Sequence, residues 1–245
     1  MTFKVYIPAR YASSRLPGKP LLEVGGKSIL RHVYDNACAS GAAEVVIATD
    51  DERIAAAATA FGGAVALTSS AHPSGTDRIA EAVAARGEAD GTIIVNVQGD
   101  EPLLPAAVIG QVAALLGADD AIDVATICEP VDDPAAVTDS NIVKVVRAAG
   151  DRALYFSRAP IPFTRDGDID VTHYRRHVGI YAYRAGYLRR FVALPPSVLE
   201  QTERLEQLRA LAHNAVVVAG DAVADCGIGV DTPADYERLR ARWNG

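Results

Sequence analysis

The sequence has few of the features that mark secreted, zinc-binding or membrane proteins. Its three cysteines, Cys38, Cys128 and Cys226, lie far apart and form no CxxC pair. This spacing argues against a disulfide framework or a zinc site and fits reduced, buried thiols. No apolar run approaches the roughly 20 residues that a membrane helix needs, and residues 1–10 hold no signal-peptide apolar core. We therefore expect a soluble, cytoplasmic protein with no membrane partner.

Basic charge is scarce as well. Of the 24 lysines and arginines only four are lysines, and the formal net charge is −7. This balance provides no broad basic surface for a phosphate backbone, so we expect no nucleic-acid partner. A small anionic substrate is still compatible with the sequence, because a few local cations matter more than the total.

The first half of the chain alternates short β-branched runs with alanine-rich helical segments. Continuous apolar strands that alternate with helices are typical of an α/β fold, with a mostly parallel central sheet covered by helices on both faces. The expected strands are 3–8, 44–49, 64–68 and 92–100, and the expected helices are 28–39, 51–61 and about 75–86.

The pattern changes between about 120 and 185, where short apolar runs follow one another with few helices. We expect this part to form a strand-rich subdomain with antiparallel strands. Helices return after 186, followed by one more strand at 215–220 and a final helix at 233–243. Because no stretch reads as a linker or a repeat, we expect a single domain over residues 1–245.

The first predicted strand runs into a loop, "IPARYASSRLPGKPLL", that gathers cations and small residues. Ligands bind at the carboxyl ends of parallel strands in open α/β sheets. Small residues let backbone N–H groups approach phosphate oxygens, and cations add charge-assisted hydrogen bonds. We therefore favour anion binding over an ordinary solvated loop. The nearby "VGGKS" lacks the earlier glycine of a P-loop. The cations and small residues of the loop are Arg10, Arg15, Lys19, Ser13, Ser14 and Gly18.

Two later stretches carry carboxylates that suit a hard metal ion. In "VNVQGDEPLL", Asp100 follows a strongly apolar strand, together with Asn96, Gln98 and Glu101. In "GVDTPADYERL", Asp231 comes just before a helix start. Mg²⁺ binds through one or two carboxylates plus substrate phosphates, so this pair would complete a magnesium site. Asp100 and Glu101 could equally well cap the helix that follows them. For the second motif, the alternative to metal binding is that it only caps a helix.

The stretch "HYRRHVGIYAY" places two histidines four residues apart, as a zinc-binding helix would. Its alternation has the period of a strand, so we reject zinc and expect His177 and Tyr181 on one face. The neighbouring arginines Arg158, Arg175 and Arg176 favour an acidic substrate.

These motifs, in this order, resemble the 3-deoxy-manno-octulosonate cytidylyltransferase family. The likeness runs from residue 7 to 240, and the combination of "FSRAPIP", "HVGIY" and "LEQLR" is more specific than the phosphate loop, which other cytidylyltransferases share. The family usually carries tryptophan where this chain has Phe163, which we leave out of the site. The resemblance implies a Rossmann-like nucleotidyltransferase fold.

It also implies a Mg²⁺-dependent enzyme that transfers the cytidylyl group of CTP to 3-deoxy-D-manno-octulosonate (KDO). The products would be pyrophosphate and CMP-KDO, which activates KDO for lipopolysaccharide synthesis, and a homodimer is implied. The implied catalytic residues are Arg10, Lys19, Asp100 and Asp231, the last two as metal ligands. The implied nucleotide-binding residues are Arg10, Arg15, Lys19, Ser74, Arg78 and Gln98. The implied sugar-acid residues are Gln98, Arg158, His177, Tyr181, Glu206 and Gln207.

Two alternatives stay open at this point. The first is a cytidylyltransferase for another acidic sugar, such as a nonulosonic acid or an 8-amino analogue of KDO. The second is a non-enzymatic nucleotide-binding module on the same scaffold. That module would be expected to lack a loop cation or a metal carboxylate, and none is missing.

Overall fold

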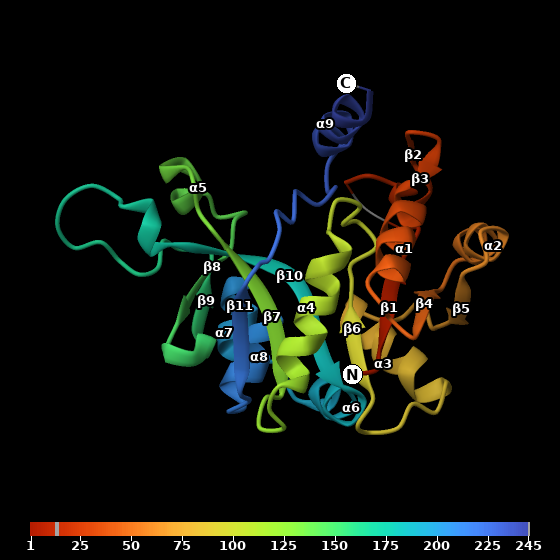
Figure 1. Cartoon of the computed structure of the whole chain (residues 1–245), viewed down its shortest axis with the longest axis horizontal. Helices are drawn as coiled ribbons and strands as arrows, with labels where there is room; N and C mark the ends of the chain where they lie inside the picture. The colour runs from red at the N-terminus through yellow and green to blue at the C-terminus, as the bar shows by residue number, and fades with distance from the viewer. Residues whose placement is uncertain (13–14, 245) are drawn as a thin grey trace.

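The computed structural model describes residues 1–12 and 15–244, and its central feature is a large mixed β-sheet (Figure 1). Ser13 and Ser14 of the opening loop lie outside the described residues. Within the described residues the main path of the sheet runs β11-β7-β10-β6-β1-β4-β5, and β8 and β9 continue from β10.

The strands are β1 (Phe3–Ala9), β2 (Glu23–Val24), β3 (Lys27–Ser28), β4 (Glu44–Thr49), β5 (Ala64–Leu67), β6 (Ile93–Asn96), β7 (Val124–Pro130), β8 (Lys144–Arg147), β9 (Ala153–Ser157), β10 (Arg175–Arg184) and β11 (Val217–Asp221). The α-helices are α1 (Ile29–Ala39), α2 (Glu52–Ala60), α3 (Gly75–Ala85), α4 (Ala106–Gly117), α5 (Pro134–Thr138), α6 (Ala185–Ala193), α7 (Val198–Glu203), α8 (Gln207–Ala212) and α9 (Pro233–Asn244). The described residues also form the short 3-10 helices η1 (Lys19–Leu21), η2 (Ala149–Asp151) and η3 (Val171–His173).

The N-terminal half forms the parallel part of the sheet that the sequence predicts. β1 pairs in parallel with β4 and β6, and β4 pairs in parallel with β5. The strand expected at 92–100 is shorter, because β6 ends at Asn96. The chain then passes close to β1 at Gly99, where a Cβ would lie 2.8 Å from the carbonyl oxygen of Pro8. A side chain there would clash, so glycine lets the next loop cross the end of β1.

The expected antiparallel strands are present, and they extend the main sheet. β10 runs antiparallel to β6 on one side and to β7 on the other. It also pairs with β8, which in turn pairs with β9. Because β10 is ten residues long, it reaches partners from both halves of the chain. The middle of the chain is therefore joined to the N-terminal half by backbone hydrogen bonds.

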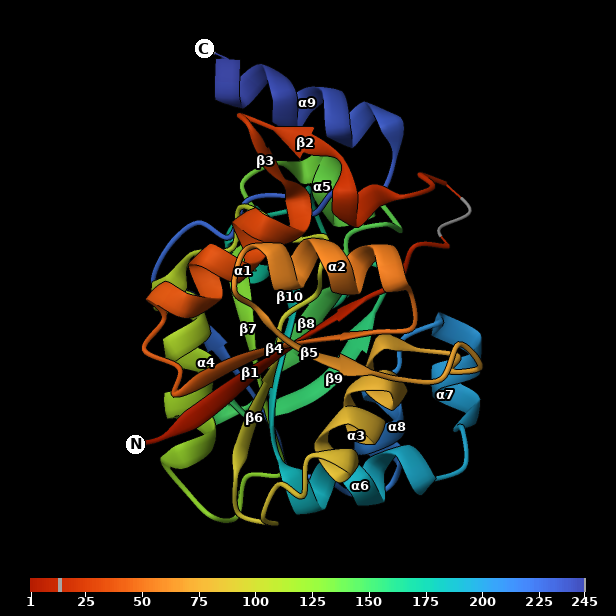
Figure 2. The same ribbon diagram turned by 90° about the vertical axis from the view of Figure 1, so that its right-hand side faces the viewer.

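Helices cover both faces of the sheet, as predicted from the continuous apolar strands. Apolar residues of α1, α2 and α4 pack on one face, and those of α3, α6 and α8 pack on the other. Figure 2 shows α1 and α2 on one side of the strands and α3 and α6 on the opposite side. Strand side chains alternate between the two layers: Val5 and Ile7 belong to the first and Tyr6 to the second.

The β2–β3 hairpin, the start of α1 and the last helix contribute to a separate apolar cluster. Figure 2 shows α9 lying over this hairpin. The "VGGKS" stretch is the turn of the β2–β3 hairpin, where Gly25 and Gly26 have φ of 58° and 77°. Two residues with positive φ suit a tight hairpin, which explains the glycine pair without a phosphate loop. The Trp243 ring of α9 packs against Gly25. Leu16 of the loop after β1 and Val230 of the segment before α9 belong to this cluster, so it packs these two segments together.

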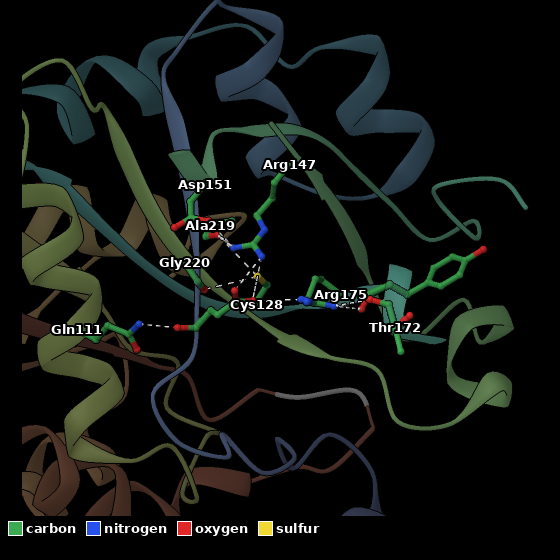
Figure 3. Close-up of polar contacts among 10 residues, drawn as sticks. Gln111, Cys128, Arg147, Asp151, Thr172, Arg175, Ala219 and Gly220 are labelled. Atoms are coloured by element: carbon green, nitrogen blue, oxygen red, sulfur yellow. Dashed lines mark hydrogen bonds and ion pairs between the residues drawn. The ribbon is translucent and has the colours of Figure 1, made fainter. Parts of the chain in front are cut away.

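A group of ion pairs lies at the edge of the sheet that β11 forms (Figure 3). Arg147 of β8 and Arg175 of β10 both reach Asp221 at the end of β11, at 3.0 and 3.2 Å. Cys128 lies beside them and is buried, and burial raises the pKa of its thiol to about 12. Cys226 is buried too, whereas Cys38 is exposed because it lies on the solvent side of α1. The expectation of three buried thiols is therefore wrong for Cys38.

No helix among the described residues is both long enough and apolar enough to cross a bilayer.

Candidate active site

A cavity of about 210 Å³ opens at the carboxyl ends of β1 and β6. Four chain segments meet there: the loop after β1, the start of α3, the loop after β6 and the segment before α9. All eight of the predicted nucleotide-binding and metal residues therefore come together. Those that line the cavity are Arg10, Arg15, Lys19, Ser74, Arg78, Gln98, Asp100 and Asp231.

Lys19 joins the two predicted metal ligands. Its Nζ lies 2.6 Å from Oδ2 of Asp100 and 3.2 Å from Oδ1 of Asp231. Arg15 reaches the same Oδ1 of Asp231 at 3.2 Å. The Lys19 side chain is 11% exposed, against 53% for Asp231, so the ammonium is buried beneath the acid. Two carboxylates from distant parts of the sequence thus converge on one cation.

This arrangement fits a hydrated divalent cation. Two carboxylate oxygens face one point from separate loops, and Mg²⁺ typically uses one or two carboxylates together with water and phosphate oxygens. Among the described residues no group of three or more His, Cys, Asp and Glu side chains forms a ready metal cage. The donor set therefore suits an ion that shares its coordination with a substrate and not a permanently enclosed one.

Glu101 lies next to this pair in a different state. Burial, reinforced by the charges of Asp100 and Asp231, raises the pKa of Glu101 to about 8. Gly229 makes room for it, since a Cβ at that position would lie 2.6 Å from Glu101 Oε1. Glu101 is therefore largely protonated at neutral pH, and Asp100 and Asp231 are the acids that line the cavity.

The start of α3 forms the opposite wall of the cavity. Ser74 caps the helix by accepting a hydrogen bond from the backbone N–H of Asp77 at 3.1 Å. Arg78, only 3% exposed, donates to Oγ1 of Thr68 at 2.6 Å and lies 3.2 Å from Oδ1 of Asp50. The N-terminus of a helix and a fixed guanidinium together favour an anionic ligand.

Gln98 links the cavity to the strand that carries two of the predicted sugar-acid residues. Its Nε2 donates to Oδ1 of Asn96 at 3.0 Å, and Asn96 lies opposite Tyr181 in the β6–β10 register. The ring of His177 is 5.4 Å from that of Tyr181, and its Nε2 is 3.0 Å from Oγ1 of Thr126. His177 and Tyr181 therefore lie side by side on β10, as the alternation predicts.

His177 and Tyr181 do not line the cavity, and burial keeps both of them neutral. It lowers the pKa of His177 to about 3 and raises the pKa of the Tyr181 phenol well above its ordinary value. An uncharged imidazole and an uncharged phenol can form hydrogen bonds without the free-energy cost of burying a charge.

Glu206 connects this part to the cavity wall. Ser74 Oγ donates to its Oε1 at 2.9 Å, and Thr76 Oγ1 donates to its Oε2. Burial raises the pKa of the Glu206 carboxyl. Gln207 follows it at the start of α8 and is 7% exposed.

Arg158 points elsewhere in this structure. Its Nε and Nη1 donate to the backbone oxygens of Glu203 and Ser140, both at 2.8 Å, and it is not among the residues that line the cavity. Its pairing with a substrate carboxylate stays a prediction. Arg175 and Arg176, which favoured an acidic substrate in the sequence, form ion pairs with Asp221 and Glu129 of the protein itself. Phe163, left out of the site, is 83% exposed.

Sequence reasoning missed several residues that shape the cavity. Asp50 and Thr68 follow β4 and β5 and hold Arg78, so their position at strand ends was a usable signal. His72 lines the cavity and its Nε2 contacts Glu81 of α3. Thr76 carried no signal, because its partner is 130 residues away.

Comparison with known proteins places this geometry in context. A family profile described as cytidylyltransferase matches residues 5–219. The chain is 53% identical, over 244 residues and 98% of each chain, to the 3-deoxy-manno-octulosonate cytidylyltransferase of Thioalkalivibrio sulfidiphilus. It is 52% identical to the protein of that name from Pseudomonas syringae, over 99% of this chain and 98% of the relative.

Solved structures show the same likeness. One described as CMP:2-keto-3-deoxy-manno-octonic acid synthetase complexed with CTP superposes with a TM-score of 0.92, at 44% identity over 99% of this chain and 98% of the other. A nucleotidyl transferase from Methanothermobacter, 14% identical with a TM-score of 0.66, shares the fold over 99% of this chain and 98% of its own.

Proposed function

Because the chain belongs to the 3-deoxy-manno-octulosonate cytidylyltransferase family, we propose that its cavity is the active site for Mg²⁺-dependent cytidylyl transfer from CTP to KDO. The enzyme transfers the cytidylyl group of CTP to KDO and releases pyrophosphate. The observation that carries the assignment of the site is the convergence of Asp100 and Asp231 on Lys19, at the carboxyl end of β1. The cations and the carboxylates that a nucleotidyl transfer site would use thus lie in one place.

The reaction makes one phosphorus–oxygen bond and breaks another. The 2-hydroxyl oxygen of KDO attacks the α-phosphorus of CTP, the bond to the bridging oxygen breaks, pyrophosphate leaves, and the hydroxyl proton is released. Negative charge builds on the phosphate oxygens during this step, and fixed positive charge close to them usually supplies the largest stabilisation.

The chain provides that charge from the loop after β1. Arg10 and Arg15 are exposed at the cavity, where Arg15 would exchange its contact with Asp231 for a triphosphate, and Lys19 lies below them. Asp100 and Asp231 would hold Mg²⁺, which neutralises phosphate charge when it is bound. Their present partner, Lys19, would then turn its ammonium toward the phosphates.

The inner part of the site would bind the sugar acid. Neutral His177 and Tyr181 provide hydrogen bonds for hydroxyl groups, and the Glu206 carboxylate accepts them. Gln98 lies between the two parts, with its amide held by Asn96. We assign the KDO carboxylate to Arg158, whose guanidinium would exchange a backbone carbonyl for the substrate.

We also infer that the enzyme works in the cytoplasm, ahead of lipopolysaccharide synthesis, and acts as a homodimer. The KDO-specific name of its relatives supports the first inference. Sedimentation of the purified protein tests the second, since a monomer at micromolar concentration would contradict it.

The decisive experiment measures pyrophosphate release with CTP, UTP and ATP against KDO, its 8-amino analogue and a nonulosonic acid. We expect turnover with CTP and KDO, and loss of turnover when EDTA removes Mg²⁺. Equal turnover with all three nucleotides would refute the nucleotide assignment. A preference for another sugar acid would refute the sugar assignment, and full activity in EDTA would refute the metal.

A further inference from the structure

The carboxylate of Glu206 is held from two sides by hydroxyl groups of the first turn of α3. Ser74 donates to Oε1 at 2.9 Å and Thr76 donates to Oε2. These contacts tie Glu206, at the start of α8, to the start of α3. Glu206, a predicted sugar-acid residue that does not itself line the cavity, is therefore joined to the nucleotide wall through Ser74.

The two hydroxyl groups are not equivalent. The Ser74 hydroxyl has a single proton, and two carboxylates compete for it: Asp77 Oδ2 at 2.6 Å and Glu206 Oε1 at 2.9 Å. Among the described residues Thr76 donates to Glu206 alone. Thr76 is thus the dedicated donor, because the shorter of the two Ser74 contacts goes to Asp77.

Thr76 is also separated from the substrates. It is 4% exposed and does not line the cavity, whereas its neighbours Ser74 and Gly75 do. A change at Thr76 can therefore reach a substrate only through another residue. Glu206, which it contacts, does not line the cavity either, but its side chain is 28% exposed beside Ser74 of the cavity wall.

We propose that Thr76 is a positioning residue of the sugar-acid site, which fixes the Glu206 carboxylate to accept hydroxyl groups of the sugar. The proposal rests on the proposed function, in which Glu206 binds the sugar acid. A carboxylate has room for about four hydrogen bonds, and the two hydroxyls of α3 occupy one position on each oxygen. Thr76 holds Oε2 whichever carboxylate takes the Ser74 proton, so the remaining positions point in directions that Thr76 sets and select a sugar with hydroxyl groups in matching places.

The charge state of Glu206 supplies a second readout. Burial and Asp77 raise its pKa, whereas the hydroxyls of Thr76 and Ser74 and the charge of Arg209 lower it. From the sheet, Tyr181 and Tyr183 face it as neutral phenols. Removal of the Thr76 hydroxyl therefore leaves Glu206 with a higher pKa, so that it stays protonated up to a higher pH.

The test compares Thr76→Val, which keeps the shape and removes the hydroxyl, with Thr76→Ser, which keeps the hydroxyl. We expect Thr76→Val to raise KM for KDO about tenfold, as the loss of one hydrogen bond to a charged group predicts. KM for CTP stays unchanged, and the acid limb of kcat/KM for KDO moves to higher pH. Thr76→Ser restores both values. Thr59→Val, which removes an exposed hydroxyl of α2, serves as the matched control.

Several results would overturn the proposal. A lower Tm without a difference between the two KM values would mean a merely structural role, as would equal increases in both KM values. If Thr76→Val does not fold, Thr76→Ala must show the same selective effect. Glu206→Gln separates the two levels of inference: an unchanged KM for KDO in that variant refutes the proposed role of Glu206, whereas a raised KM there with a normal Thr76→Val refutes only the role of Thr76.

Discussion

The two ends of the candidate site differ in charge: the outer end is the cavity, and the inner end is the pair His177 and Tyr181 on β10, which do not line the cavity. At the outer end, Lys19, Asp100 and Asp231 form an ionic cluster in which Asp231 is 53% exposed. At the inner end, His177 and Tyr181 are held neutral by burial. Water screens charges at the outer end, and desolvation penalises them at the inner end. Burial thus separates a place suited to phosphates and a metal ion from a place suited to hydroxyl groups.

The strongest test of this contrast removes charge from the outer end. Asp100→Asn and Asp231→Asn keep the side-chain shape but lose the charge that a hard cation needs, so each should lower kcat by at least about 10²-fold. Because both acids would serve one ion, the double variant should be little worse than either single one. The measurement is pyrophosphate release as a function of Mg²⁺ concentration.

The control for this test is Asp51→Asn. Asp51 caps α2 and pairs with Arg53 away from the cavity, and asparagine caps a helix about as well as aspartate. Its kcat should stay at the wild-type value. Unchanged Mg²⁺ dependence in either cavity variant would remove that acid from the site.

The second test asks whether the inner end holds a charged partner. Arg158→Ala should raise KM for KDO about 30-fold, corresponding to about 2 kcal/mol for a desolvated charge pair, with KM for CTP unchanged. Arg158→Lys keeps the charge but not the planar fork, so an intermediate KM is expected. If Arg158→Ala changes only Tm, the guanidinium stabilises the fold through its hydrogen bonds to the backbone of Ser140 and Glu203 and does not bind the substrate.

The third test uses acid to probe the neutral inner end. The pKa of His177 is about 3 in the folded protein and about 6.5 in an unfolded chain. Between these values the unfolded state binds a proton that the folded state does not, so stability falls as pH decreases from about 7 toward 3. The slope from one such group is at most about 1.4 kcal/mol per pH unit.

His177→Gln should therefore flatten the decline in denaturant-measured stability between pH 7 and pH 4. His173→Gln, at an exposed position, provides the comparison and should leave the slope unchanged. An equal slope in wild type and His177→Gln would show that the imidazole is not kept neutral by burial.

The smallest expected effect separates capping from catalysis at the outer end. Thr232 accepts a hydrogen bond from the N–H of Asp235 at the start of α9, directly after Asp231. Thr232→Ala should cost about 1 kcal/mol of stability and leave kcat unchanged. Differential scanning calorimetry and the release assay measure the two quantities. A large loss of kcat would mean that Asp231 acts mainly through the geometry of this cap.

Local patterns in the sequence were sufficient to predict most elements of the fold. The periods of apolar residues gave the strands β1, β4 and β5 and the helices α1, α2 and α3 to within about two residues. Polar residues after β1 and β6 marked the edge where the cavity opens. These features depend on residues only a few positions apart, so they are visible in the sequence itself.

The tertiary structure alone decided which of these residues meet. Asp231 reaches Lys19 because the β2–β3 hairpin and α9 pack together, and Thr76 reaches Glu206 because α3 and α8 pack on the same face. Arg158 turns toward backbone carbonyls, and the arginines next to His177 find acids of the protein. Such contacts depend on how distant segments pack. They also depend on which polar groups become buried, because a buried polar group requires a hydrogen-bond or ion-pair partner. The sequence by itself therefore determined the elements and the edge of the site, whereas long-range packing determined its partners and its charge.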